Sequence, residues 1–266
     1  MVDTEKFYTC KSDRAFKEVF MKEESKDILA KVLETVLKVE IKDIKFLNLE
    51  RNVGNIHIRK KYFDLFLDTN IGKIQLEVNA DYDKSKKIRN TAFICDTFSH
   101  VTLKGKEYTD DILIIQINFS YENVKDEYIT KMMIRDEEGE SYINNFIIYD
   151  INMVKCRNLW YTKDESLKEY KYLTMLDLEE LSKKDEVISK YMETLEEVNQ
   201  DPEFREYMSM EEDAIKMENS HISRSIRQGI QQGIEKITKN MLEENMDINL
   251  ISKLTGLSEE EINSLK

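Results

Sequence analysis

The alternation of apolar and polar residues over the first 80 positions predicts a helical start followed by a β-hairpin. An amphipathic stripe over residues 12–37, with a break near residues 23–26, predicts two short helices. Residues 44–49 predict a short strand. Residues 62–79 alternate apolar and polar side chains on both sides of a turn at residues 68–72, which is the period of two of paired strands.

Further along, the pattern predicts one helix and three strands. Residues 83–103 have helical spacing, and Gly105 ends the helix. The nearly unbroken apolar run of residues 111–120 predicts a strand that is buried on both faces. Residues 128–135 and 145–153 predict two more strands across a turn. The order of these elements indicates a mixed α/β fold.

The remainder of the chain is helical and rich in charge. The single proline, Pro202, follows Asp201 and is placed like the first turn of a new helix. We therefore expect three regions, which are a core at residues 1–160, an acidic helical region at 161–236 and a small helical module at 237–266.

The last module has the pattern of two short helices around Gly256, with Ser258 as the N-cap of the second helix. This arrangement resembles half of a helix-turn-helix. A role in reading DNA is disfavoured, because Glu259, Glu260 and Glu261 open the second helix and would repel phosphates.

Two glycines, Gly229 and Gly233, lie four residues apart in the long helical stretch before this module. They either permit close contact between helices or mark a weak segment that orders only in an oligomer. Together with the apolar stripes of the terminal helices, they make a homodimer through the carboxyl-terminal helices an expected partner.

Composition and charge narrow the class of protein. The 266 residues, 41% of them hydrophobic, can form a sizeable core. No stretch reaches the roughly 18 apolar residues of a membrane span, and the amino terminus lacks the plan of a signal peptide, so we expect a cytoplasmic protein without a membrane partner. Three widely separated cysteines predict neither a disulfide framework nor a zinc knuckle.

The net charge of −13 argues against a polyanionic partner, but it belongs to the second half of the chain. Residues 1–120 hold 21 basic and 20 acidic residues. Basic runs at residues 59–61 and 84–89 flank the hairpin strand. They form either a rim that attracts phosphates or an ordinary solvated surface.

Two carboxylates meet on the predicted hairpin. If the turn is centred between Asn70 and Ile71, Asp64 lies opposite Glu77, and opposed residues point to the same side of a sheet with Cβ atoms roughly 5 Å apart. Like charges placed in this way destabilise a sheet unless a cation compensates them. Mg²⁺ or Mn²⁺ accepts such carboxylates together with a backbone carbonyl, such as that of Val78, and activates a phosphodiester for hydrolysis.

The spacing leaves a second interpretation open. The polar face of the hairpin can equally look at solvent, with Asp64 and Glu77 separated by water or paired to Lys73 or Lys17. The spacing alone does not decide between a metal site and this ordinary polar surface.

Four segments occur in a particular order along the chain: SDRAFKEVF near the start, YFDLFLDTNIGKIQLEVN in the hairpin, KKIRNTAFICDTF in the next helix and LKGKEYTDDILIIQINF around the buried strand. In this order they resemble the Rpn branch of the PD-(D/E)XK nuclease superfamily, the recombination-promoting nucleases also described as transposases. The tail from residue 227 onward resembles the carboxyl-terminal end of that family. The resemblance implies a restriction-endonuclease-like mixed central sheet flanked by helices, and a Mg²⁺-dependent or Mn²⁺-dependent endonuclease acting on DNA.

By this resemblance Asp64 and Glu77 are metal ligands, and Asn79 takes the position that orients the attacking water. The superfamily usually has Lys or Gln there. Asn is uncharged and one methylene shorter than Gln. The amide role is therefore kept in weakened form, or Lys73 or Lys17 supplies a charge from another position, or activity has been lost.

The resemblance also extends to the helices on either side of the hairpin. Arg89 matches the arginine of the following helix, a phosphate contact that Lys84 and Lys87 of the same basic run would share. Asp13 and Lys17 match the opening helix motif, where a polar residue supports the metal or a water.

We therefore expect a Mg²⁺-dependent DNA endonuclease. One alternative is a nuclease-fold protein that binds DNA or a sibling protein without cutting. Another is a structural or assembly factor that uses only the tail helices.

Overall fold

The structure, a computed structural model, describes residues 6–47, 64–80, 84–102, 113–122, 125–181 and 184–265. The described residues divide into two compact units, one up to Asp201 and one from Pro202 onward. None of the helices in the described part has the length and apolar character that a membrane crossing requires.

One mixed sheet lies at the centre of the first unit. Its strands, in the described part of the chain, are β1 (Lys45–Phe46), β2 (Leu65–Thr69), β3 (Gly72–Asn79), β4 (Ile114–Ser120), β5 (Ile129–Met133) and β6 (Phe146–Asn152). Their order is β1-β2-β3-β4-β6-β5, in which β3, β4 and β6 run parallel and the other neighbours pair antiparallel. The predicted mixed α/β order, with its hairpin and its fully buried strand, is confirmed.

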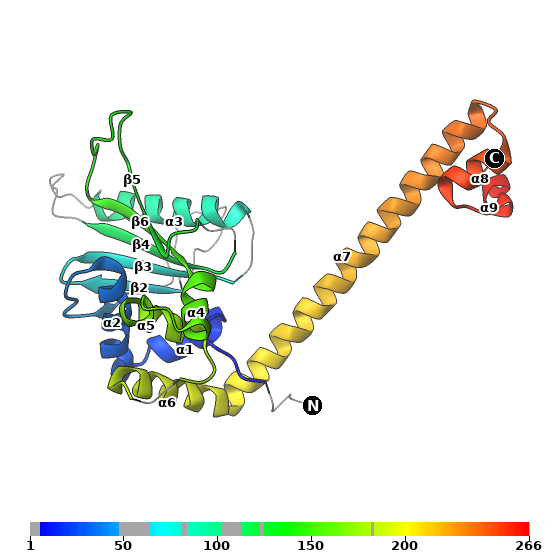
Figure 1. Cartoon of the computed structure of the whole chain (residues 1–266). Helices are drawn as coiled ribbons and strands as arrows, with labels where there is room; N and C mark the ends of the chain where they lie inside the picture. Colours follow the sequence, from blue (N-terminus) through cyan, green and yellow to red (C-terminus); the bar gives the residue numbers. More distant parts are fainter. Residues whose placement is uncertain are drawn as a thin grey trace. The chain divides into compact units, whose positions relative to one another are not determined.

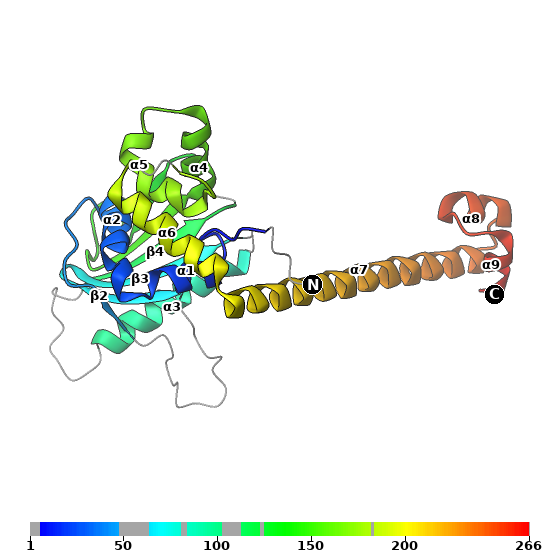
Figure 2. The ribbon, with the colours of Figure 1, turned by 90° about the horizontal axis from the view of Figure 1, so that it is seen from below.

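Helices cover both faces of this sheet (Figures 1 and 2). On one face lies α3 (Lys84–Thr102), which contacts β3 and β4. On the other side lie α1 (Asp13–Phe20), η1 (Glu23–Ser25), α2 (Lys26–Leu37), α4 (Met153–Thr162), α5 (Leu167–Thr174), η2 (Met175–Asp177) and α6 (Glu186–Gln200). Of these, α1 contacts β3 and α4 contacts β4, while α2, α5 and α6 pack against the other helices.

Alternation along the strands gives the two sheet faces different chemistry. Val78 of β3 and Phe119 of β4 are level in the sheet, and the ring of Phe119 lies 5.5 Å from that of Phe16 in α1. On the opposite face the side chain of Gln75 in β3 hydrogen-bonds to the hydroxyl of Thr97 in α3. On that same face Ile94 of α3 packs against Ile114 and Phe146. The face that holds α3 is therefore partly polar and partly apolar.

The second unit is helical, as predicted, and consists of α7 (Pro202–Glu243), α8 (Ile248–Thr255) and α9 (Glu259–Ser264). Gly256 ends α8 with φ of 76°, a left-handed conformation that glycine adopts without strain. Ser258 caps α9, and its reciprocal bonds with Glu261 form a capping box. Ile251, Leu257 and Ile262 form the core of this small module.

Phe16→Ala should lower the free energy of unfolding by about 3–5 kcal/mol, because it removes a fully buried ring between α1 and the sheet. Chemical denaturation followed by circular dichroism measures this loss. Tyr142→Ala, which removes a ring that is 81% exposed, should change the value by less than about 0.5 kcal/mol. Equal losses in the two variants would contradict the packing of α1 described above.

Candidate active site

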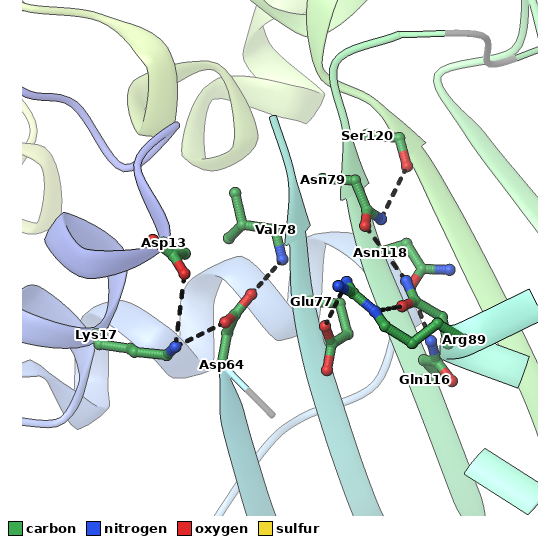
Figure 3. A network of polar contacts seen from close by, with 11 residues as sticks. Asp13, Lys17, Asp64, Glu77, Val78, Asn79, Arg89, Gln116, Asn118 and Ser120 are labelled. Atoms are coloured by element: carbon green, nitrogen blue, oxygen red, sulfur yellow. Dashed lines mark hydrogen bonds and ion pairs between the residues drawn. The ribbon is translucent and has the colours of Figure 1, made fainter. Parts of the chain in front are cut away.

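The hairpin pairs in the register that the sequence predicts. Leu65 of β2 stands opposite Leu76 of β3. The preceding residue, Asp64, therefore comes level with Glu77, and the two residues are only 8% and 3% exposed. Figure 3 shows both carboxylates on neighbouring extended segments. Two acidic side chains are thus held out of water at the carboxyl end of β3.

Asp64 has a partner for each of its carboxylate oxygens (Figure 3). Its Oδ2 accepts a hydrogen bond from the backbone N–H of Val78 at 2.7 Å. Its Oδ1 lies 2.8 Å from Nζ of Lys17, a residue of α1. Oδ2 of Asp13, one turn earlier in α1, lies 3.7 Å from the same Nζ. The pairing with Lys17, which the spacing had left open, is therefore present.

Lys17 is a fixed positive charge at this place. Burial alone would lower the pKa of Lys17, but the charge and hydrogen bond of Asp64 outweigh it, and the charges of Asp13 and Glu77 add to the effect. The pKa of Lys17 is therefore raised above its ordinary value. The ammonium group stays charged over the whole physiological range.

The carboxylate of Glu77 has fewer hydrogen-bond and ion-pair partners than that of Asp64. Its Oε1 is buried and has no hydrogen-bond partner within the described part of the chain. Nη2 of Arg89, from α3, lies 3.8 Å from Oε2. Burial, and after it the charge of Asp64, raises the pKa of Glu77 from 4.5 to about 8, against the opposing charges of Arg89 and Lys17. At neutral pH this carboxylate therefore holds a proton or needs a further cation.

These donors fit a divalent metal ion. A buried carboxylate oxygen without a hydrogen-bond partner, beside a second carboxylate, has the chemistry of a ligand for a hard cation. Across the described residues, no group of three or more His, Cys, Asp or Glu side chains is placed to hold a metal. Asp64 and Glu77 would therefore share an ion with backbone, water or substrate oxygens, as Mg²⁺ sites commonly do.

Asn79 belongs to a cluster of amides beside the carboxylates. Its Oδ1 accepts a hydrogen bond from Nδ2 of Asn90 at 3.3 Å, and its Nδ2 donates to Oγ of Ser120 at 3.5 Å. Asn90 also donates to Oδ1 of Asn118 at 3.2 Å, and Nε2 of Gln116 donates to that oxygen at 2.9 Å. The amide of Asn79 is thus tied to α3 and β4.

Sequence analysis missed this amide cluster. Residues 111–120 were interpreted as an apolar run, although Gln116, Asn118 and Ser120 occupy every second position of β4. That period of two was the available signal. The register pairs these residues with Gln75, Glu77 and Asn79 of β3.

A pocket of about 140 Å³ opens next to the amide cluster. Asn118 and Asp150 line it from the sheet, and Lys87 lines it from α3. Burial raises the pKa of Asp150, while a hydrogen bond from Ser120 and the charge of Lys87 oppose the rise. The pocket therefore adds polar groups of both charge signs beside the carboxylates.

The basic residues expected to contact DNA lie in the first turns of α3. Lys87 is exposed, and Arg89 is half-exposed beside Glu77, with its guanidinium 5.8 Å from the centre of the Phe93 ring. Lys84 begins α3, but its side chain lies outside the described residues. Positive charge therefore borders the carboxylates on the α3 side.

Lys73 is not brought to the carboxylates. Its Nζ lies 3.1 Å from Oδ1 of Asp68, at the turn end of the hairpin. Four residues of strand, roughly 13 Å, separate Lys73 from Glu77. Of the two lysines considered from the sequence, Lys17 is the one that lies beside Asp64.

Comparison with known families agrees with this geometry. The model of the PD-(D/E)XK nuclease family transposase matches residues 10–225. The chain belongs to this family. The Rpn resemblance and the predicted fold, a mixed sheet flanked by helices with a helical carboxyl-terminal region, are confirmed. No curated protein and no solved structure matches the chain.

A second model, that of the carboxyl-terminal HTH domain of the Rpn/YhgA-like nuclease family, matches residues 231–266 of this PD-(D/E)XK protein. It covers α8 and α9, so the predicted resemblance of these helices to a helix-turn-helix is confirmed. The match suggests DNA binding. The three glutamates in the first turn of α9 still argue against phosphate contacts at that turn.

Glu77→Gln should change how the metal-free protein responds to pH. Because the pKa of Glu77 is raised to about 8, this residue contributes stability that is present below about pH 4.5 and is lost as the pH rises through 8. The variant should melt like the wild type at pH 5 and at a higher temperature at pH 9. Thermal unfolding in EDTA measures both, and parallel pH profiles would contradict the raised pKa.

Proposed function

We propose that the chain is a Mg²⁺-dependent DNA endonuclease, with Mn²⁺ as an alternative ion, whose metal is held by Asp64, Glu77 and the backbone carbonyl of Val78. The observation that carries this proposal is the buried, unpartnered Oε1 of Glu77 beside the carboxylate of Asp64. Membership of a nuclease family supports it.

A divalent ion bound there would polarise the phosphodiester and lower the pKa of a bound water. Lys17 then supplies the charge that the superfamily usually draws from a residue at the position of Asn79. Its Nζ is fixed 2.8 Å from Asp64, is only partly exposed and stays protonated, so it can stabilise negative charge that develops on the phosphate. Asp13 keeps this ammonium oriented toward the site.

The amide of Asn79 would orient the attacking water. Its hydrogen bonds to Asn90 and Ser120 engage both ends of that amide, which argues that Lys17 carries the larger share of the catalytic effect. Arg89 and Lys87, with Lys84, border the carboxylates and would bind the DNA backbone through its phosphates.

The other parts of the chain take subordinate roles in the same proposal. The core of residues 1–160 would cut DNA. The acidic region of residues 161–236 would connect this core to the last module, and the module of residues 237–266 would bind DNA. A cytoplasmic homodimer through the carboxyl-terminal helices would bring two nuclease sites to one duplex, as a double-strand break requires.

A second candidate function is DNA binding without cutting. The observation that favours it is the amide of Asn79, whose oxygen and one N–H are already engaged by Asn90 and Ser120 at the position where the superfamily usually has Lys or Gln. Asn79→Lys separates the two functions, because a gain of cutting would mean that the metal site is intact and only poorly equipped.

Asp64→Ala should abolish Mg²⁺-dependent nicking of supercoiled plasmid, because it removes one of the two ligand carboxylates. Isothermal titration with Mn²⁺ should show binding to the wild type and none to the variant. Asp68→Ala, an acidic residue at the turn end of the hairpin, is the matched control and should retain both. Nicking by the Asp64→Ala protein at the wild-type rate would refute the assignment.

Lys17→Met should reduce the cleavage rate by about 10²–10³-fold while leaving Mn²⁺ binding in place, because it removes a charge that acts on the phosphate. Lys73→Met is the matched control, since its side chain has the same 26% exposure and pairs with Asp68 away from the site. Single-turnover cleavage measures both variants. A larger loss in Lys73→Met or in Asn79→Ala than in Lys17→Met would assign the role to that residue instead.

A further inference from the structure

A stripe of isoleucines on α7 has no partner within the described part of its unit. Five side chains are each about half exposed, between 49% and 58%: Ile215, Ile222, Ile226, Ile230 and Ile237. At 100° per residue they all fall within a sector of about 80° on one side of the helix. The α8–α9 module covers a different set of α7 residues, Ile234, Met241 and Leu242. Within the described residues of its own unit, the isoleucine stripe is therefore left uncovered.

Two glycines in the same stretch have no packing partner among the described residues of their unit. Gly229 and Gly233 lie inside the helix, where glycine is less favourable than alanine. Apart from the adjoining residues and backbone of α7 itself, no described atom lies within 4 Å of the place that a Cβ would occupy at either residue. A second helix crossing close to this face would make use of the missing side chains.

The stripe is symmetric about Ile226. Ile222 and Ile230 lie four residues to either side of it, and Ile215 and Ile237 lie eleven residues to either side. Two antiparallel copies related by a two-fold axis at Ile226 would therefore place isoleucine against isoleucine along the whole seam. The recurring spacing of eleven residues is the repeat of nearly straight, slightly right-handed helix pairs.

The two glycines also fit the two-fold arrangement about Ile226. In that arrangement Gly229 comes level with Ser223 of the second copy, and Gly233 comes level with Asn219 of the second copy. No large side chain thus faces a glycine, and the two backbones can approach closely where the helices cross.

Charge favours the antiparallel orientation. Residues 202–221 of α7 hold six acidic and two basic side chains, whereas residues 222–243 hold four basic and two acidic ones. Antiparallel pairing sets the acidic half against the basic half, and it brings Glu218 close to Lys236 of the second copy on the same flank of the seam. Parallel pairing would set acidic half against acidic half.

We propose that α7 is a self-association helix: two copies of this chain pair antiparallel through the isoleucine stripe, with Ile226 on the two-fold axis. The inference deepens the homodimer of the proposed function and rests on it for its purpose. Its tests are a mass and a cross-link rather than DNA cleavage. A dimer of this kind without nuclease activity would refute the proposed nuclease alone.

The first test is the mass of the full chain by light scattering at micromolar concentration. The wild type should have twice the 31.6 kDa of one chain, and Ile226→Asp should reduce the mass to 31.6 kDa. Met217→Asp is the matched control, because Met217 is exposed and apolar but lies on the opposite side of α7, and it should stay dimeric. Circular dichroism should show the same helix content in all three proteins. A monomeric wild type, or a dimeric Ile226→Asp, would overturn the proposal.

The second test fixes the orientation by disulfide cross-linking. Cys95 is exposed and is first replaced by serine, whereas Cys10 and Cys156 are buried with the pKa of each thiol raised to about 12. On this background, mild oxidation should link Ile226→Cys chains to each other in high yield.

Ile215→Cys chains should not link to themselves but should link to Ile237→Cys chains in a mixture. The two positions of one chain are 22 residues, roughly 33 Å, apart along the helix. Self-linking of Ile215→Cys would show a parallel pair and overturn the antiparallel arrangement. Failure of Ile226→Cys to link while the mass stays that of a dimer would place the interface elsewhere and would equally overturn the proposal.

Discussion

The site depends on the charge of Asp64, held in place by one backbone N–H and one ammonium group. The N–H of Val78 and Nζ of Lys17 lie 2.7 Å and 2.8 Å from the two carboxylate oxygens of Asp64. Burial, and after it the charge of Asp64, raises the pKa of Glu77 on the neighbouring strand, and the same carboxylate pairs with Lys17 of α1. Neutralising Asp64 would therefore alter the charge state of its neighbours as well as remove one of the two carboxylates proposed to bind the metal.

The sheet brings these groups together from its two opposite faces. Lys17 comes from α1, which is anchored on the apolar face by the contact of Phe16 with Phe119. Arg89 comes from α3, which is anchored on the opposite face by hydrogen bonds of the amides. Apolar contacts of Ile94 and Phe98 with Phe146 also hold α3. The two helices thus reach the carboxyl end of β3 from opposite faces of the sheet.

Much of this arrangement follows from local patterns in the sequence. The hairpin register could be predicted because its turn is short and every side chain alternates, so the level of Asp64 with Glu77 follows from counting residues. The helices at residues 12–37 and 83–103 follow from their spacing and capping residues in the same way.

The remainder of the site depends on packing between elements that are distant in sequence. The spacing could not choose between Lys17 and Lys73, because the choice depends on where α1 rests on the sheet. The amide cluster was missed because the hydrogen bonds of the three polar residues in β4 form only when α3 packs over that strand. The helix-turn-helix module was visible from Gly256 and Ser258, since caps are local signals.

The unpartnered oxygen of Glu77 has a consequence for the exchange of protons with solvent. A carboxyl group that is largely protonated at neutral pH must release its proton before it can ligate a cation. Occupancy by an ion would then rise with alkalinity, and each ion taken up near neutrality would acidify an unbuffered solution. Mild acid would keep Glu77 protonated and so disfavour a cation beside it, a reversible change that involves one proton and no refolding.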